Sequence, residues 1–272
     1  MKRFTRKRIT RALVVLAGVY IAGGILLYFI QDLLLFHPKS LPPNHRFGFS
    51  QPFDEINLPV EGRNLNIVRF RAGGTPRGAV LYFHGNMKNI ERYAYVAPLF
   101  TKQGYDLWMM DYPGFGKSTG KRSEQTLYAD ARRVYELAGK EFPPENLVIY
   151  GRSIGTGIAS ELASEKPCRM LILETPYYSI DALAKSYFPI YPVTPLTNYA
   201  FPINQYLKKA STPTYIIHGT EDEVIPYSQS RRLKKENPAL HLITIPGGRH
   251  NDLSEHALFQ ATITRLLYRE ER

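Results

Sequence analysis

The chain has 272 residues, of which 44% are hydrophobic and 22% charged, and its formal net charge is +11. This composition excludes collagen-like, coiled-coil and disordered classes, and the length allows one large α/β domain or two smaller domains. A single cysteine, Cys168, excludes an intramolecular disulfide framework and a cysteine-rich zinc site. The positive charge makes nucleic-acid binding a candidate function. Whether this candidate stands depends on where the basic residues lie along the chain.

The first feature along the chain is a basic arm followed by an apolar segment. Residues 1–11 carry six basic side chains and no acidic one, and residues 12–30 are uncharged. Nineteen helical residues span roughly 28 Å, about the thickness of a bilayer's hydrocarbon core. A buried core helix of this length would show a polar stripe, and this segment has none. A cleaved signal peptide would end near the weak cleavage site at Ala22-Gly23-Gly24, but six further apolar residues follow that site. We therefore expect an uncleaved signal-anchor, that is, one transmembrane helix.

The distribution of basic residues predicts the orientation of this anchor. Because the basic arm precedes the span, the positive-inside rule places the N-terminus in the cytoplasm and the remaining chain outside it, in the periplasm if the source is Gram-negative. Without residues 1–32 the chain keeps 29 basic and 23 acidic residues, a net of +6. The remaining basic run, at residues 231–235, is typical of a solvated helix face. We expect no nucleic-acid partner.

After a connector at residues 31–50, short apolar runs alternate with segments of helical spacing. The predicted strands are Leu65–Phe70, Ala79–Phe83, Tyr105–Met110, Leu147–Tyr150, Met170–Leu173, Tyr215–Ile217 and Leu242–Ile245. The predicted helices are Ile90–Thr101, Ser123–Glu141, Ser153–Glu165, Ser228–Glu236 and Ser254–Tyr268, with Ser123, Ser228 and Ser254 as candidate N-caps. Continuously apolar strands between helices indicate a mostly parallel sheet with helices on both faces. Glu55–Val60 and Leu65–Phe70 are expected to form an antiparallel hairpin at one edge.

An insert at residues 175–210 interrupts the alternation. It has no clear strand pattern, and it is rich in tyrosine, phenylalanine and proline. Four prolines between positions 189 and 202 exclude one long helix. Such a long connection is typical of a lid or a binding element, and the alternative is an aromatic pad that packs on the sheet.

The predicted strand Leu147–Tyr150 runs into Gly151-Arg152-Ser153-Ile154-Gly155, a G-x-S-x-G pattern at the start of a helix. In such an elbow the serine occupies a tight strand-to-helix turn that exposes its hydroxyl, and the glycines allow close packing. Short motifs of this kind occur by chance, so the position between a strand and a helix is what gives this one weight. Ser153 is therefore the candidate nucleophile.

A nucleophilic serine needs a base and a group that orients the base. Asp222 follows the strand Tyr215–Ile217, and His250 follows the strand Leu242–Ile245. These are the carboxyl ends of predicted parallel strands, where ligands bind in open α/β sheets. Ser153, Asp222 and His250 thus form a candidate triad.

Neighbouring residues offer alternatives to two members of this triad. Glu221 and Glu223 flank Asp222 and compete for the role of the acid. His84 and His218 lie beside glycines at strand ends, and we expect them to brace loops rather than to transfer protons.

An oxyanion hole is expected from the loop that follows the first parallel strand. His84-Gly85-Asn86 occupies this position, and Gly85 permits a turn that directs backbone N–H groups inward. The backbone N–H groups of Asn86 and of Ile154, the residue after the serine, are the candidate donors, each worth about 3 kcal/mol in the transition state.

From about residue 50 onward these motifs resemble the α/β-hydrolase superfamily. The matching pieces, in order, are Tyr82-Phe83-His84-Gly85-Asn86 with Asn89, Asp111-Tyr112-Pro113-Gly114-Phe115-Gly116-Lys117-Ser118, Gly151-Arg152-Ser153-Ile154-Gly155, the Asp222 loop ending at Pro226, and His250. The chain is most similar to a membrane-anchored branch of serine esterases and acylglycerol or lysophospholipid hydrolases. The resemblance implies the α/β-hydrolase fold over residues 51–272, a Ser-His-Asp triad, and a structural role for the loop at residues 112–118.

The sequence thus predicts a membrane-anchored serine hydrolase that cleaves carboxylic esters through an acyl-enzyme. Lipid or other acyl-chain esters are the candidate substrates, and the substrate-binding residues and the oligomeric state are not predicted. The alternatives are a serine peptidase of the same fold and a membrane-tethered binding protein without catalysis. We expect neither a metal nor a cofactor, because the chain has no metal-ligand spacing and no dinucleotide-binding fingerprint.

Overall fold

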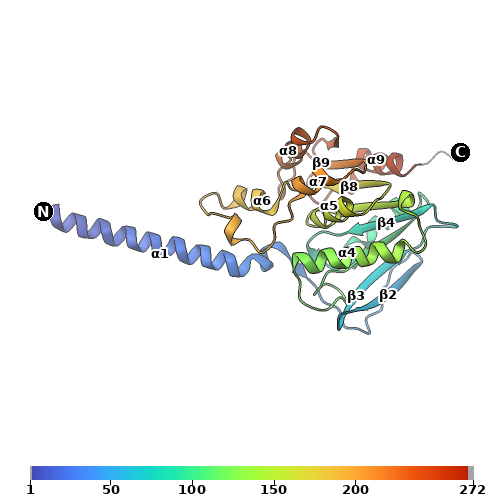
Figure 1. Cartoon of the computed structure of the whole chain (residues 1–272), viewed down its shortest axis with the longest axis horizontal. Coiled ribbons are helices and arrows are strands. Elements are labelled where there is room, and N and C mark those ends of the chain that lie inside the picture. The colour runs from blue at the N-terminus through green and yellow to red at the C-terminus, as the bar shows by residue number, and fades with distance from the viewer. Residues whose placement is uncertain (1, 269–272) are drawn as a thin grey trace.

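The computed structural model describes residues 2–268, and its centre is a twisted eight-stranded sheet (Figure 1). In spatial order the strands are β10 (His241–Ile245), β9 (Thr214–Gly219), β8 (Met170–Glu174), β7 (Leu147–Arg152), β4 (Gly78–Phe83), β6 (Tyr105–Met110), β3 (Arg63–Phe70) and β2 (Phe53–Val60). All neighbours pair in parallel except β3, which is antiparallel to both β2 and β6. The predicted parallel sheet and its edge hairpin are both confirmed.

Helices cover both faces of the sheet. The longer ones are α4 (Glu124–Ala138), α5 (Gly155–Glu165), α8 (Ser228–Glu236) and α9 (Ala257–Leu267). Short elements complete the layers: α2 (Ile90–Tyr93), η1 (Ala94–Val96), α3 (Ala97–Thr101), η2 (Pro144–Asn146) and η4 (Leu253–Glu255). Neighbouring residues of one strand pack into two hydrophobic cores on opposite faces of the sheet. Leu81 packs with α4 and α5, whereas Val80 packs with α3 and α9. Burial on both faces explains why the strands are continuously apolar.

Several predicted helix boundaries are wrong. The segment at residues 90–101 divides into α2, η1 and α3, and a proline, which lacks an N–H, occupies the first turn of α3. Ser123 caps α4 by accepting the Thr126 N–H at 3.1 Å, as predicted. The N-cap of α8 is instead Tyr227, and α9 begins at Ala257 after His256. Ser228 and Ser254 therefore do not cap these helices.

The insert contains α6 (Ile180–Tyr187), the short turn η3 (Thr194–Leu196) and α7 (Ile203–Lys209). Its described residues contain no strand between positions 175 and 210. Tyr177 and Phe201 are buried in the core beside α5, whereas Tyr187 and Ile190 are exposed. One part of the insert is therefore a packed pad, and the other part is exposed; a role of the exposed part as a lid stays a prediction.

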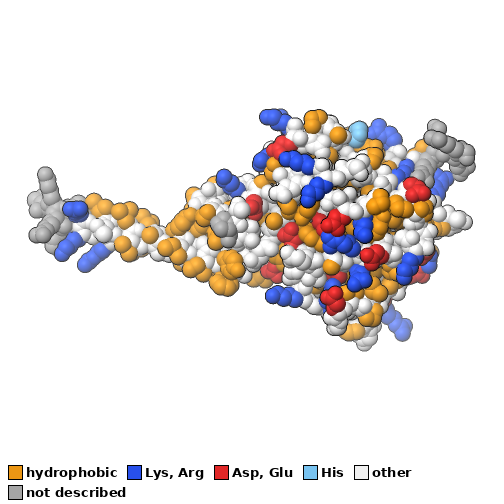
Figure 2. Space-filling model, viewed as in Figure 1, with side chains coloured by type: hydrophobic (Ala, Val, Ile, Leu, Met, Phe, Trp, Pro, Cys, Tyr) orange, Lys and Arg blue, Asp and Glu red, His pale blue; other side chains and the backbone are white. Residues whose placement is uncertain are grey.

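Helix α1 (Lys2–Leu35) projects from the domain as a single 34-residue helix (Figure 1). Residues 6–35 are long and apolar enough to cross a membrane, and the most apolar part is not buried by the rest of the protein. Its side chains are mainly hydrophobic, with basic residues near the N-terminal end (Figure 2). The helix therefore includes both the predicted arm at 1–11 and the predicted anchor at 12–30, except for residue 1, which lies outside the described residues, as do residues 269–272 of the predicted domain.

The chain that leaves α1 is fixed to the domain at once. Phe36 is buried, and its ring lies 6.4 Å from that of Phe115. The strand β1 (His37–Pro38) pairs in parallel with β5 (Met87–Lys88), and the His37 N–H donates to the carbonyl of Asn86 at 2.9 Å. The end of α1 is thereby joined to the loop after β4 by strand pairing and a hydrogen bond.

Candidate active site

Ser153 lies at the turn between β7 and α5 with a φ of +52°, a left-handed backbone conformation that is strained for a residue with a side chain. Its N–H donates to the Glu174 carbonyl at 2.9 Å, which ties the turn to β8. A Cβ at Gly151 would overlap the carbonyl of Gly155, and a Cβ at Gly155 would overlap the carbonyl of Phe83. The two glycines of the motif are therefore required by close packing around the serine.

The structure brings Ser153, His250 and Asp222 into one hydrogen-bonded line. The Ser153 Oγ lies 3.1 Å from His250 Nε2, and His250 Nδ1 lies 2.8 Å from Asp222 Oδ2. All three residues are largely buried and lie just beyond the carboxyl ends of β7, β10 and β9. Parallel pairing brings these strand ends to one edge of the sheet. With a proton on Nδ1, the His250 ring can accept the serine proton at Nε2 and remain held by the carboxylate.

Four donors stabilise the charged form of Asp222. Its Oδ1 accepts the backbone N–H groups of Val224 at 2.9 Å and Ile225 at 2.7 Å, and His218 Nε2 lies 3.1 Å from Oδ2. Burial alone would raise the pKa of Asp222, but the hydrogen bonds from His218 and His250, together with the backbone donors, hold the pKa well below its usual range. The carboxylate therefore stays ionised beside the histidine.

The two competing acids do not contact the histidine ring. Glu221 is exposed, and Glu223 instead accepts the backbone N–H of His250 at 3.3 Å and lies 3.5 Å from Arg249. Glu223 thus fixes the loop that carries the histidine, and Asp222 is the acid at its ring.

His218 and Arg152 contribute to the site in ways the sequence did not indicate. His218 accepts the Ser230 hydroxyl at Nδ1 (2.6 Å) and donates from Nε2, so it bridges α8 and Asp222 besides bracing its loop. Buried Arg152 pairs with Glu174 at 3.2 Å and donates to the Tyr95 hydroxyl at 2.8 Å and to the His250 carbonyl at 3.4 Å. The one sequence signal for these roles is position along the chain: Arg152 directly precedes Ser153, and His218 lies four residues before Asp222.

The loop after β4 is shaped by His84. Its Nδ1 lies 2.7 Å from the carbonyl of Gly85, and the Tyr112 hydroxyl donates to the His84 carbonyl at 2.6 Å. These contacts agree with the expected bracing role of His84. Asn86 in this loop lines the same cavity as Ser153 and Ile154, so the two residues of the predicted oxyanion donors, Asn86 and Ile154, both lie at the serine.

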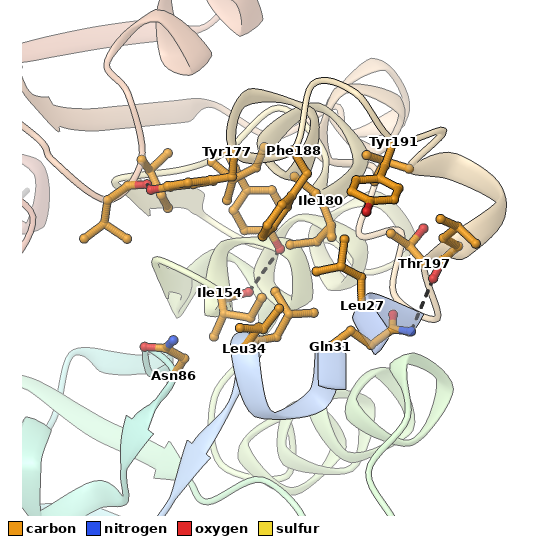
Figure 3. Close-up of a pocket in the computed structure, with 18 of the residues that line it drawn as sticks. Leu27, Gln31, Leu34, Asn86, Ile154, Tyr177, Ile180, Phe188, Tyr191 and Thr197 are labelled. Carbon is orange, nitrogen blue, oxygen red and sulfur yellow. Dashed lines mark hydrogen bonds between the residues drawn. The ribbon is translucent and has the colours of Figure 1, made fainter. Parts of the chain in front are cut away.

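A cavity of about 340 Å³ begins at Ser153 and runs between the insert and the end of α1 (Figure 3). Asn86 and Ile154 border one end, and apolar side chains form most of the wall, including Leu34 from α1 and Phe188 from the insert. The Tyr177 hydroxyl donates to the Ile154 carbonyl at 3.3 Å, so its polar atom is satisfied inside this apolar space. None of the described residues that line the cavity carries a charge. The geometry suits an uncharged, elongated group next to the serine.

No group of three or more His, Cys, Asp or Glu side chains within residues 2–268 is arranged to hold a metal ion.

In sequence, the chain is similar to known α/β hydrolases. A family model described as serine aminopeptidase S33 matches residues 74–206, and a model named BD-FAE matches residues 190–236. The chain is 32% identical over 213 residues to the α/β hydrolase domain-containing protein 17C of Xenopus tropicalis, which covers 77% of this chain and 67% of that protein. It is 35% identical over 184 residues to the α/β hydrolase domain-containing protein aho-3 of Caenorhabditis elegans, which covers 66% of this chain and about half, 54%, of that protein.

Solved structures show the same fold. The esterase Pf2001 of Pyrococcus furiosus superposes with a TM-score of 0.67 at 17% identity, over 86% of this chain and 96% of that one. Est1E of Butyrivibrio proteoclasticus, solved with ferulic acid, superposes with a TM-score of 0.66 at 19% identity, over 78% and 97%. Since the strand order, the motifs and these relatives agree, the chain belongs to the α/β-hydrolase superfamily.

Proposed function

We propose that this protein is a serine hydrolase that cleaves carboxylic esters of apolar acyl chains. The observation that carries the proposal is the line from Asp222 through His250 to Ser153, with the uncharged cavity starting at the serine. The hydrolase family and the esterase neighbours support the reaction class, and the apolar wall supports the substrate class.

The first half of the reaction forms an acyl-enzyme. His250 Nε2 takes the Ser153 proton as Oγ bonds to the carbonyl carbon of the ester, and the carbonyl oxygen becomes an oxyanion. The backbone N–H groups of Asn86 and Ile154 donate to this oxyanion, and each donor contributes about 3 kcal/mol. Asp222 keeps the imidazole in the required tautomer and stabilises its cationic form.

Collapse of the oxyanion breaks the bond between the carbonyl carbon and the alcohol oxygen, and the alcohol leaves with the proton from His250. Water then gives a proton to His250 and bonds to the acyl carbon. The second collapse breaks the bond to Ser153 Oγ, which regains its proton from His250, and the carboxylic acid departs. Each turnover consumes one ester and one water and returns the enzyme unchanged.

We propose further that residues 12–30 span a membrane, with the arm at 1–11 in the cytoplasm and the hydrolase domain at 51–272 on the other side. The length of α1 and the basic residues at its N-terminal end support this topology. Protease treatment of intact cells or spheroplasts that express the protein with a C-terminal tag tests it. Loss of the tag from intact spheroplasts agrees with the proposal, and protection until lysis contradicts it.

A peptidase is the second candidate, because the family model that matches residues 74–206 carries that description. An aminopeptidase has to neutralise the ammonium group of its substrate, and a buried ammonium without a carboxylate is costly. The cavity wall has no acidic side chain among the described residues. This absence favours an ester over an amino-terminal peptide.

Removal of the nucleophile is the direct test. We expect Ser153→Ala to lower hydrolysis of a p-nitrophenyl butyrate solution by roughly 10⁴-fold or more and to abolish labelling by a fluorophosphonate probe. Ser164→Ala, on the same helix α5 but outside the site, is the matched control and should keep activity and labelling. Undiminished turnover by the Ser153 variant would remove the proposal.

A further inference from the structure

The exposed end of the insert packs on the membrane-spanning helix. We call residues 187–193 the lid tip. Within it, the Tyr191 ring stacks on that of Tyr20 with centroids 4.7 Å apart and planes 7° from parallel. The Tyr20 hydroxyl donates to the Ile190 carbonyl at 2.8 Å, and the Tyr191 hydroxyl donates to the Tyr20 carbonyl at 3.3 Å. Both phenolic groups are therefore satisfied by contacts between the lid tip and α1.

Two glycines of α1 make room for this contact. A Cβ on Gly23 would overlap the Tyr191 hydroxyl, and a Cβ on Gly24 would lie 3.4 Å from the same ring. Gly18, one and a half turns away, has no atom within 4 Å of the position of its Cβ. The surface of α1 is thus open where the lid tip docks.

The docking position is deep along the span. Tyr20 precedes Asp32 by twelve helical residues, which corresponds to about 18 Å. Asp32 pairs with Arg122 at 3.2 Å, and Gln31 accepts the Asn198 N–H at 2.6 Å, so the polar boundary of α1 lies at the domain. Half of a hydrocarbon core is about 15 Å thick. If the apolar part of α1 is in a bilayer, the lid tip is in it as well.

The chemistry of the lid tip suits this environment. No charged residue occurs between Lys185 and Lys208, and the side chain of Ile190 is 70% exposed. A non-helical backbone in lipid is costly unless its polar groups are paired or absent. Pro189 and Pro192 have no N–H, the Tyr191 N–H donates to the Phe188 carbonyl at 3.2 Å, and the Ile190 carbonyl accepts from Tyr20. These four backbone polar groups, which a bilayer would penalise, are thus removed or satisfied.

The cavity joins these elements to the nucleophile. It extends from Ser153 past Leu34 to Leu27 of α1 and to Tyr191 of the lid tip, and the labelled side chains of Figure 3 converge on it from both elements. Because β1 pairs with β5 beside Asn86, the position of α1 relative to the site is fixed by the fold. The membrane-spanning helix is therefore part of the cavity wall.

We propose that the lid tip inserts into the leaflet next to the hydrolase domain, docked on the Gly23-Gly24 surface of α1, and that the acyl chain of an ester in this leaflet enters the cavity directly from the bilayer. The inference rests on the proposed esterase function and deepens it. The substrate class is an ester whose acyl chain resides in a membrane, and Leu27, Leu34 and the lid tip determine its selection.

The test compares two glycines of the same helix in the full-length enzyme, reconstituted in phosphatidylcholine vesicles. The substrates are 4-methylumbelliferyl palmitate within the vesicles and soluble 4-methylumbelliferyl butyrate. We expect Gly23→Leu to lower the ratio of palmitate to butyrate turnover at least tenfold, because its side chain displaces Tyr191. Gly18→Leu adds the same apolar side chain at an open position and should leave the ratio within twofold of the original.

The outcomes separate the two proposals. If the unaltered enzyme cleaves neither ester, or if Ser153→Ala cleaves both, the esterase function itself is wrong. If the enzyme cleaves both esters but Gly23→Leu has the same ratio of palmitate to butyrate turnover as Gly18→Leu, the esterase function stands and the inference is overturned.

A second measurement needs no activity. Ile190→Trp places an indole at the lid tip, and the single native tryptophan, Trp108, is buried in the sheet and gives the background. We expect vesicles of phosphatidylcholine brominated along the acyl chains to quench the added fluorescence and its emission to be shifted to the blue. Emission typical of water without quenching would overturn membrane insertion, including in the case where Gly23→Leu fails to fold.

Discussion

At the scale of single residues, the contacts of Asp222 determine the charge that lies beside His250. The carboxylate is inaccessible to solvent, yet it accepts two backbone N–H groups and contacts two histidines. A buried carboxylate with this many donors is stabilised in its charged form, so its pKa is lowered rather than raised. The charge that orients His250 therefore persists in moderately acidic solution.

This shift makes a prediction about stability and pH. Because the pKa of Asp222 is lower in the folded chain than in the unfolded one, the ionised carboxylate stabilises the fold above its unfolded pKa of about 3.9. That contribution is lost as the pH falls from about 5 through the lowered pKa. We expect Asp222→Asn to be less stable than the original protein at pH 7 and the difference to shrink toward pH 2.5. Urea unfolding across this range measures it.

Glu221→Gln, which alters an exposed neighbour of Asp222, is the control and should follow the original protein at every pH. The Asp222 variant should also lose about 10⁴-fold in kcat, since an amide favours the wrong imidazole tautomer. A stability difference that stays constant with pH would contradict the assigned ionisation of Asp222.

At the scale of elements, the helix starts show how a local signal is overridden. Serine is a favoured N-cap at all three predicted positions, but of the three only Ser123 occupies an N-cap, where its side chain accepts a helix N–H. At α8 the turn after Pro226 begins one residue earlier, so Tyr227 occupies the cap. The preceding loop, which carries Asp222, sets where this helix starts.

The difference between two of these serines is measurable. We expect Ser123→Ala to lower the free energy of unfolding by about 1 kcal/mol, because it removes the acceptor of the Thr126 N–H. Ser228→Ala is the matched substitution at a helix start without a side-chain cap and should change the stability by no more than about 0.5 kcal/mol. Equal effects in chemical denaturation would contradict the assigned caps.

At the scale of the whole molecule, the α/β-hydrolase domain and α1 are built as one body. The buried Phe36, the pairing of β1 with β5 and the ion pair of Asp32 with Arg122 attach the helix to the domain at three points. The +11 charge is unevenly distributed over this body. Basic residues of α1 lie at the end far from the domain, in agreement with the proposed orientation, and the described cavity lining has no charge.

This arrangement predicts a dependence on acyl-chain length. Each methylene that enters an apolar cavity contributes up to about 0.8 kcal/mol, which corresponds to roughly fourfold in kcat/KM. We expect kcat/KM for soluble p-nitrophenyl esters to rise from acetate through octanoate. A hemisuccinate ester should be a poor substrate because no cation in the described lining pairs with its carboxylate. A flat or falling series would contradict an acyl chain in this cavity.

Much of the fold follows from local pattern. The seven predicted strands match β3, β4 and β6–β10 because each is a short, mostly apolar run, and the hairpin of β2 and β3 follows from its short polar turn. The parallel pairing then brings Ser153, Asp222 and His250 to one edge, as predicted, and their catalytic roles stay predictions. The division of residues 90–101 into three short helices is not predicted, because a proline such as Pro98 is tolerated in the first turn of a helix and does not by itself indicate that a helix ends.

By itself, the sequence determined the superfamily, the three residues that meet at the strand ends, and a helix able to span a membrane. The sequence signals for these features are local, since each lies within one strand, one turn or one apolar run. The roles of His218 and Arg152, and the docking of the lid tip on α1, join segments up to 171 positions apart. Only the tertiary structure decided them, because the position of a side chain in space depends on how the whole sheet assembles.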